Sequence, residues 1–310
     1  MRGILGLDHQ SGAIIRRVSG RITQLVMLCL ICSFPMMQVI RASAASAGSG
    51  YWASQVDSDY STIFYNNGDL KIEAYFYKPE GAGPFPLVVY NHGSRAGRER
   101  QEVPFRYVAD VLKTSGYAVL VPERRGYGKS DGQTFTEEVG NDVASKMMRR
   151  FREEASDVLA GLDHVRQFHS IDPARVAITH VAIMGWSHGG VVSIIAASER
   201  REFTALVDQA GGALTWSRSP TLRTELPAAA RKVGIAALCM GAQNDATTDA
   251  VKEVGDAIKS AGSWEKTIIY PPFTPTTNPG NIAPGHLIFS SQGISIWQND
   301  VLSFLHSHLH

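Results

Sequence analysis

The feature that most constrains the fold is the alternation of short apolar runs with longer amphipathic stretches, from residue 70 to the C-terminus. Most of these runs are continuous, which is typical of strands covered by helices on both faces. Strands that alternate with helices predict a mainly parallel sheet wrapped by helices. The predicted strands are Leu70–Tyr77, Pro86–Asn91, Ala118–Pro122, Val181–Gly185, Ala205–Asp208, Ile235–Gly241 and Thr267–Tyr270.

Five segments between these runs have helical character. The clearest is Asn141–Phe168, where Val143, Met147, Phe151 and Ala155 recur at helical spacing. Between Asp208 and Val233 the chain is short and contains two prolines, so we expect a short flap there at most and no large lid. One domain over residues 48–310, with no internal repeat, fits the length. The other predicted helices are Val103–Thr114, Gly189–Glu199, Thr247–Ala261 and Ile294–His308.

Residues 1–47 have the layout of a secretory signal peptide followed by a linker. Three arginines precede the apolar run Leu25–Ile40, and the small residues Ala42–Ala44 follow it. The run has about 16 residues and includes Pro35, whereas a helix that spans a bilayer needs roughly 20. We therefore expect cleavage and a secreted or periplasmic protein without a membrane partner. The alternative is an uncleaved signal that anchors the protein in the membrane.

Charge and cysteine content exclude several function classes. Lys and Arg number 30 against 29 Asp and Glu, which leaves no bulk basic field for a nucleic acid. Cys29 and Cys32 lie in the predicted signal peptide, so cleavage leaves Cys239 alone and no intramolecular disulfide. Cys239 lies in an apolar run and is expected to be a buried thiol. No metal or organic cofactor is expected.

The segment Gly185–Gly189 fits the pattern G-x-S-x-G, with Ser187 at its centre, between a predicted strand and a predicted helix. A serine at the tip of such a sharp turn has strained backbone angles, and glycines two residues before and after it provide the room. The turn also directs the N-terminus of the helix and the backbone N–H of His188 toward the oxygen that becomes negative during acyl transfer. We interpret Ser187 as a nucleophile.

A second oxyanion donor is expected in the loop after the strand Pro86–Asn91. This loop reads His92-Gly93-Ser94, and Gly93 lets the main chain approach a substrate closely. The backbone N–H of Ser94 is the predicted donor. His92 is interpreted as a loop anchor rather than as a catalytic base.

A serine nucleophile needs a base and a carboxylate that orients the base. Asp245 follows the predicted strand Ile235–Gly241, and a carboxylate at that end of a parallel sheet faces the crevice where such sites lie. Asp208 ends the preceding strand and is the alternative acid. His286 follows a long loop rich in proline and glycine, which is typical of a functional loop, and is the predicted base.

These motifs, together with Arg125–Asp131, resemble the α/β-hydrolase superfamily in type and order over about residues 70–305. Within it the chain resembles the dienelactone hydrolase-like branch and the catalytic domains of prolyl oligopeptidases, which share the Gly-Trp-Ser-x-Gly-Gly turn. The resemblance implies a mostly parallel central sheet of about eight strands with helices on both faces and no large lid. True dienelactone hydrolases have a cysteine where this chain has Ser187, so lactone specificity does not follow.

The substrate-binding predictions concern the loops that should border the site. Arg95 and Arg98 could bind an anionic group of a substrate through their guanidinium groups, while the interleaved glutamates favour the alternative of ordinary ion pairs. Trp186 and Tyr127 are further predicted substrate contacts. We expect hydrolysis of carboxylic esters of small molecules through an acyl-enzyme. The alternatives are a serine peptidase or amidase of the prolyl oligopeptidase type, and a non-catalytic binding protein on a hydrolase scaffold.

Overall fold

The computed structural model describes residues 56–57, 59–81, 83–171 and 177–309. Contacts divide the chain into Met1–Gly50 and Tyr51–His310, and the second unit carries every described residue. The predicted signal peptide and its two cysteines lie outside the described residues. Within the described ranges, no helix is both long and apolar enough to cross a bilayer.

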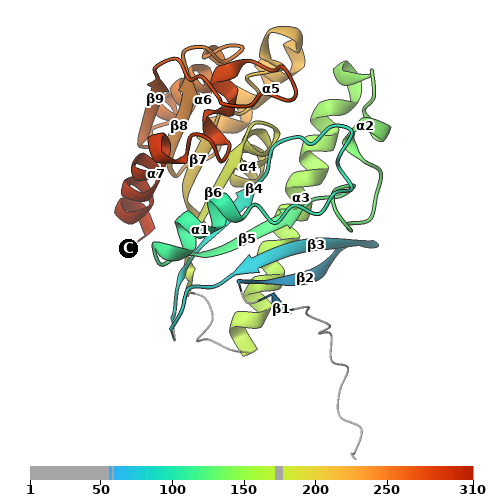
Figure 1. The fold of residues 1–310 in the computed structure, drawn as a ribbon, viewed down its shortest axis with the longest axis vertical. Helices are drawn as coiled ribbons and strands as arrows, with labels where there is room; N and C mark the ends of the chain where they lie inside the picture. Colours follow the sequence, from blue (N-terminus) through green and yellow to red (C-terminus); the bar gives the residue numbers. More distant parts are fainter. Residues whose placement is uncertain (1–55, 58, 82, 172–176, 310) are drawn as a thin grey trace, which may run out of the picture. The chain divides into compact units, whose positions relative to one another are not determined.

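The described residues form one nine-stranded sheet in the order β1-β2-β3-β5-β4-β6-β7-β8-β9 (Figure 1). Strands β4 to β9 pair in parallel, whereas the pairs β1–β2, β2–β3 and β3–β5 are antiparallel. The predicted α/β fold with a mostly parallel sheet is confirmed. The strands are β1 Val56–Asp57, β2 Tyr60–Asn67, β3 Leu70–Tyr77, β4 Pro86–Asn91, β5 Ala118–Glu123, β6 Ala177–Trp186, β7 Phe203–Gln209, β8 Ala236–Ala242 and β9 Glu265–Tyr270.

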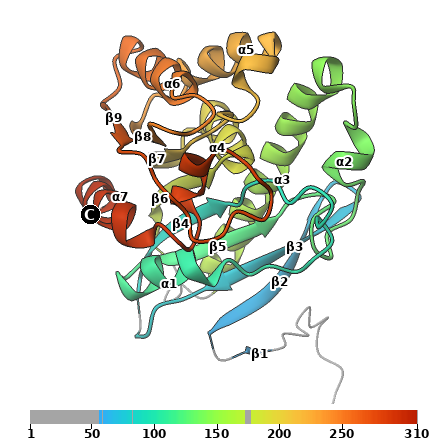
Figure 2. The ribbon, with the colours of Figure 1, turned by 45° about the horizontal axis from the view of Figure 1, so that its top comes forward.

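The helices form two layers on the sheet (Figures 1 and 2). Helices α1 and α7 pack against each other, while α3, α4, α5 and α6 form a row in which each contacts the next. Helix α4 contacts α3 and α5 as well as β4, β6 and β7, which explains why ten of its twelve residues are buried. The helices are α1 Arg106–Thr114, α2 Phe135–Glu138, α3 Val143–Ile171, α4 His188–Glu199, α5 Pro220–Ala230, α6 Asp249–Ser260 and α7 Ile294–Leu309.

The segment expected to hold a short flap at most contains helix α5 instead. The Ser219 hydroxyl accepts a hydrogen bond from the N–H of Leu222 at 3.2 Å, and Pro220 occupies the first turn, where a missing N–H costs nothing. Leu222 and Leu226 are buried, and α5 packs on α4 and α6. The segment therefore belongs to the layer of helices, and no large lid is present in the described part of the chain.

Candidate active site

Ser187 lies in the sharp turn between β6 and α4. Its backbone has φ of 58° and ψ of −117°, in a region that residues with a side chain rarely adopt. The N–H of Ser187 donates to the carbonyl oxygen of Gln209 on the neighbouring strand at 2.8 Å. This hydrogen bond fixes the turn to the sheet. The strained backbone angles of Ser187 are those expected for a nucleophile in such a turn.

The glycines on either side of Ser187 are required by close packing. A Cβ on Gly185 would lie 2.2 Å from the carbonyl oxygen of Gly189. A Cβ on Gly189 would lie 2.0 Å from the carbonyl oxygen of Asn91, at the end of β4. The turn therefore excludes any side chain at both positions, as the sequence pattern predicts.

The loop after β4 lies against this turn. A Cβ on Gly93 would be 3.5 Å from the Cβ of Ser187 and 3.4 Å from the carbonyl oxygen of Trp186. His92 is buried, its Nδ1–H donates to the carbonyl oxygen of Gly93 at 2.8 Å, and its ring stacks on Phe105 at 5.0 Å. These contacts give His92 the anchoring position predicted for it. Ser94, the next residue but one, is exposed.

His286 and Asp245 meet from two segments that are distant in the chain. Asp245 follows β8, and His286 lies in the 3-10 helix Pro284–Phe289. The Nδ1 of His286 is 2.9 Å and 3.1 Å from the two carboxylate oxygens of Asp245. Both side chains are almost completely buried, at 2% and 1% exposure. A Cβ on Gly285 would lie 2.5 Å from the backbone nitrogen of Asp245, which explains the glycine before the histidine.

The other ring nitrogen of His286 is the one available for chemistry. Its Nε2 is buried and has no hydrogen-bond partner among the described residues. The imidazole ring lies 5.6 Å from the ring of Trp186, centroid to centroid, and Trp186 directly precedes Ser187. The base candidate therefore lies beside the nucleophile turn with one nitrogen held by a carboxylate.

Asp208, the alternative acid, has different surroundings. It is fully buried at the end of β7, and one carboxylate oxygen accepts a hydrogen bond from the N–H of Gly211 at 3.0 Å. Burial raises the pKa of Asp208 to about 7, and the hydrogen bond from Gly211 opposes this rise. Of the two carboxylates considered from the sequence, Asp245 is the one in contact with His286.

The predicted substrate contacts differ in their availability. Arg95 forms an ion pair with buried Glu123, with an Nη1–Oε1 distance of 3.0 Å, and its guanidinium lies over the ring of Tyr127 at 5.1 Å. Tyr127 is fully buried. The structure thus leaves neither Arg95 nor Tyr127 free to contact a substrate, and it favours the ion-pair alternative for Arg95. Arg98 is exposed, and Trp186 is half-buried beside His286.

A buried cluster of charged residues next to the site was not found from the sequence. The side chain of His188 is bonded to Glu154 on α3, with 2.6 Å between Nε2 and a carboxylate oxygen. Glu154 also accepts hydrogen bonds from Arg124 and Arg150, and all three are fully buried. Charged residues on an amphipathic helix usually face solvent, so the sequence carried no signal for this cluster.

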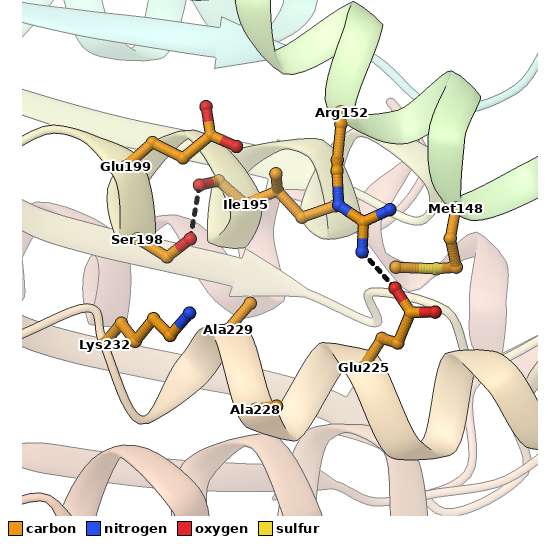
Figure 3. Close-up of a pocket in the computed structure, with 9 residues that line it drawn as sticks. All are labelled: Met148, Arg152, Ile195, Ser198, Glu199, Glu225, Ala228, Ala229 and Lys232. Carbon is orange, nitrogen blue, oxygen red and sulfur yellow. Dashed lines mark hydrogen bonds and ion pairs between the residues drawn. The ribbon is translucent and has the colours of Figure 1, made fainter.

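Potential metal ligands and cavities in the described part of the chain add nothing to the residues named so far. Within the described ranges, no group of three or more His, Cys, Asp or Glu side chains is placed to hold a metal ion. A cavity of about 230 Å³ lies between α3, α4 and α5, where Arg152 forms an ion pair with Glu225 (Figure 3). None of the residues that line this cavity is a predicted site residue.

Comparison with known proteins gives similarities in sequence and in fold. A sequence profile described as the prolyl oligopeptidase family matches residues 104–227, which include the Ser187 turn. Acylaminoacyl peptidase from Pyrococcus horikoshii superposes with a TM-score of 0.61 at 19% identity, over 81% of this chain and 42% of that chain. Dienelactone hydrolase from Anabaena variabilis superposes with a TM-score of 0.56 at 21% identity, over 81% of this chain and 99% of that one. The chain has the α/β-hydrolase fold.

The chain is thus similar in part of its sequence to the prolyl oligopeptidase family and in its fold to a dienelactone hydrolase. A Pyrococcus furiosus esterase superposes with a TM-score of 0.55 at 18% identity, over 81% of this chain and 94% of that chain. The quorum-quenching protein AidA of Acinetobacter baumannii is 28% identical over 149 residues, which cover 47% of this chain and 42% of AidA. The chain thus matches less than half the length of this curated relative.

Proposed function

We propose that this α/β-hydrolase cleaves carboxylic esters of small substrates, with Ser187, His286 and Asp245 as its catalytic triad. The observation that carries the proposal is the pairing of His286 with Asp245 through Nδ1, beside the strained turn of Ser187, with Nε2 left unpaired by the described residues. This arrangement leaves a buried imidazole that is oriented by a carboxylate and has one nitrogen ready to accept a proton.

The first half of the reaction acylates Ser187. Its hydroxyl attacks the ester carbonyl carbon while Nε2 of His286 takes the hydroxyl proton. The resulting oxyanion accepts hydrogen bonds from the N–H groups of His188 and Ser94. His188 is the first residue of α4, so its N–H has no partner within the helix. The tetrahedral intermediate then collapses, and His286 gives its proton to the departing alcohol.

The second half of the reaction frees the acid. Water loses a proton to His286 and attacks the acyl carbonyl, and the same two N–H groups stabilise the second oxyanion. Collapse of this intermediate releases the carboxylic acid and returns the proton to Ser187. Asp245 stabilises the imidazolium in both halves, because its buried carboxylate lies against Nδ1. Every step uses side chains, backbone N–H groups and water.

Ester cleavage is preferred to peptide cleavage for two reasons. The chain spans most of the esterase and of the dienelactone hydrolase to which it is similar, but less than half of the acylaminoacyl peptidase. Esters also have a better leaving group than amides, so the same triad cleaves them over a lower barrier. A serine peptidase or amidase is the second candidate because the prolyl oligopeptidase family profile matches the region around Ser187.

The test combines assays on two series of substrates with labelling by an active-site probe. Purified protein is assayed against nitrophenyl acetate, butyrate and octanoate and against aminoacyl nitroanilides, and it is labelled with a fluorophosphonate. We expect turnover of an ester, and labelling that disappears in Ser187→Ala. Faster turnover of an anilide than of any ester would replace the esterase with an amidase. Absence of labelling on folded protein would favour a non-catalytic binding protein.

We also propose that the protein is exported and that its first 47 residues include a signal peptide that is removed. The three arginines, the apolar run and the small residues that follow support this proposal. An uncleaved signal that anchors the protein in a membrane is the alternative.

A further inference from the structure

A buried ion pair joins the two backbone segments proposed to form the oxyanion hole. Arg124 follows β5, and Glu154 lies in α3; both side chains are fully buried. The Nε–H of Arg124 donates to an Oε of Glu154 at 2.7 Å. Among the described residues, neither side chain forms a hydrogen bond with Ser187, Asp245 or His286, yet each reaches a segment next to the proposed triad.

Arg124 and Glu154 each contact a different one of the two segments proposed to form the oxyanion hole. The Nη2–H of Arg124 donates to the backbone carbonyl oxygen of His92 at 2.9 Å, two residues before Ser94. The same Glu154 oxygen that binds Arg124 accepts a hydrogen bond from Nε2–H of His188 at 2.6 Å. The loop after β4 and the N-terminus of α4 are therefore connected through a single arginine and a single carboxylate.

The protonation states of the cluster fit these contacts. Burial alone raises the pKa of Glu154, but His188, Arg124 and Arg150 together hold that pKa well below its usual range. Burial lowers the pKa of His188 and the charge of Glu154 opposes this shift, while the Nε2–H of the imidazole donates to the carboxylate. Arg150 occupies the other Glu154 oxygen at 2.8 Å. Both oxygens are thus engaged, which fixes the orientation of the carboxylate.

We propose that Arg124 and Glu154 are positioning residues that hold the N–H groups of Ser94 and His188 at the separation that a tetrahedral oxyanion requires. The proposal rests on the proposed serine hydrolase mechanism. Oxyanion stabilisation depends on donors fixed in advance at hydrogen-bond distance, so a small relative shift of two separate segments weakens it. One fork-shaped guanidinium and one carboxylate couple the two segments directly, because guanidinium donors lie in a rigid plane.

A neighbouring ion pair joins the same loop to the same helix but does not contact the proposed oxyanion hole. Arg125 and Asp157 come from the same loop and the same helix, and their guanidinium and carboxylate groups are joined by two hydrogen bonds of 2.9 Å. The described contacts of Asp157 run to Arg125 and to Asn67 on β2, not to either oxyanion segment. Asp157→Asn is therefore a matched control for Glu154→Gln.

The experiment measures kcat, KM and inhibition by a trifluoromethyl ketone for wild type, Glu154→Gln and Asp157→Asn. The ketone forms a tetrahedral adduct with the nucleophile and so reports oxyanion stabilisation. We expect Glu154→Gln to lower kcat and weaken ketone binding by a similar factor of about ten or more, with KM within about twofold, since loss of a whole donor costs roughly 10²–10³. Asp157→Asn should leave all three values within about twofold.

A second variant keeps the test decisive if Glu154→Gln folds poorly. In Arg124→Lys, one ammonium replaces a guanidinium fork that bonds Glu154 and His92 through different nitrogens, so we expect the same parallel loss of kcat and of ketone affinity. All rates are normalised to folded protein measured by circular dichroism. A lower melting temperature with unchanged kcat and ketone affinity in a folded variant would overturn the positioning role. Failure of the proposed function is distinct, because wild type itself would then show neither turnover nor labelling.

Discussion

At the scale of single residues, the two carboxylates that end neighbouring strands have opposite environments. Asp245 is held against an imidazole by two short contacts, whereas Asp208 is surrounded by backbone and glycine. The sequence placed both residues at the carboxyl end of the sheet and favoured Asp245, but the spacing could not decide between them. The choice depends on the path of the loop that carries His286, which has no periodicity to interpret.

The proposed role of Asp245 predicts a large and specific loss of rate. In Asp245→Asn the amide fits the same space but no longer stabilises the imidazolium or fixes the tautomer of His286. We expect kcat to fall by roughly a thousandfold or more with little change in KM. The matched change Asp208→Asn should leave kcat within about threefold. Ester hydrolysis measured for both variants checks this, and a larger loss in Asp208→Asn would make Asp208 the triad acid.

Asp208 also predicts a pH-dependent stability. Its pKa is about 7 in the folded protein against 3.8 ordinarily, so the folded state binds a proton in this window that the unfolded state has lost. Stability from this group is therefore complete below pH 4 and is lost as the pH rises through about 7. Asp208→Asn should raise the free energy of unfolding by roughly 2–4 kcal/mol at pH 8. Urea unfolding at pH 8 and pH 4 measures this, and an equal gain at both values would contradict it.

At the scale of elements, the junction of β4, β6 and α4 tolerates almost no added volume. A methyl group on Gly189 would overlap the backbone of Asn91, and backbone cannot move aside cheaply. We expect Gly189→Ala to yield little folded protein. Gly280→Ala is the control, since its Cβ would meet only Ile282 at 3.5 Å. The soluble yield and the melting temperature of both variants are measured. A Gly189→Ala protein that melts like wild type would show that the turn can rearrange.

Gly93 predicts the opposite pattern, a loss of activity without a loss of fold. An added Cβ would make ordinary contacts of 3.4–3.5 Å with the backbone of Trp186 and the side chain of Ser187. The methyl group would therefore fit, but it would fill space next to the nucleophile. We expect Gly93→Ala to melt within a few degrees of wild type and to lower kcat/KM for esters by about tenfold or more. Unchanged kcat/KM would place the substrate on another side of Ser187.

Some elements could be predicted from the sequence and others could not. Buried parallel strands such as β4 and β5 are continuous apolar runs, and the predicted bounds agree within one or two residues. Strand β2 was not predicted because it lacks a continuous apolar run. It lies near the edge of the sheet, where partly exposed positions carry serine, threonine and asparagine. Helix α5 was missed because Pro220 and Pro227 were taken as breakers, whereas one occupies the first turn and the other is tolerated within the helix.

At the scale of the whole molecule, the functional residues come from segments spread over about two hundred residues, and parallel topology brings their strand ends to one edge. The order of the proposed serine, acid and base along the chain was predicted from motifs alone. The cluster around Glu154 was not, because its members are charged residues that only tertiary packing buries. Sequence patterns thus pointed to the proposed triad but not to the buried charges beside it.

The proposed signal peptide gives a prediction for the N-terminus of the exported protein. If the signal peptide is removed, the exported protein should begin close to residues 43–50, and its mass should lack the arginines and the apolar run. Intact-mass measurement and N-terminal sequencing of protein from the periplasmic or culture fraction check this. Recovery of the full-length mass from the membrane fraction would support an uncleaved anchor.

Cys239 lies in the middle of β8, and burial holds the pKa of its thiol well above the usual value. A thiol in that condition does not react with maleimide dyes, because thiolate is the reactive species. A processed chain without Cys29 and Cys32 would thus not be labelled by a maleimide dye. Replacing exposed Ser94 by cysteine would keep the backbone N–H of the loop and add one reactive handle, so a fluorophore there could report the arrival of a substrate in real time.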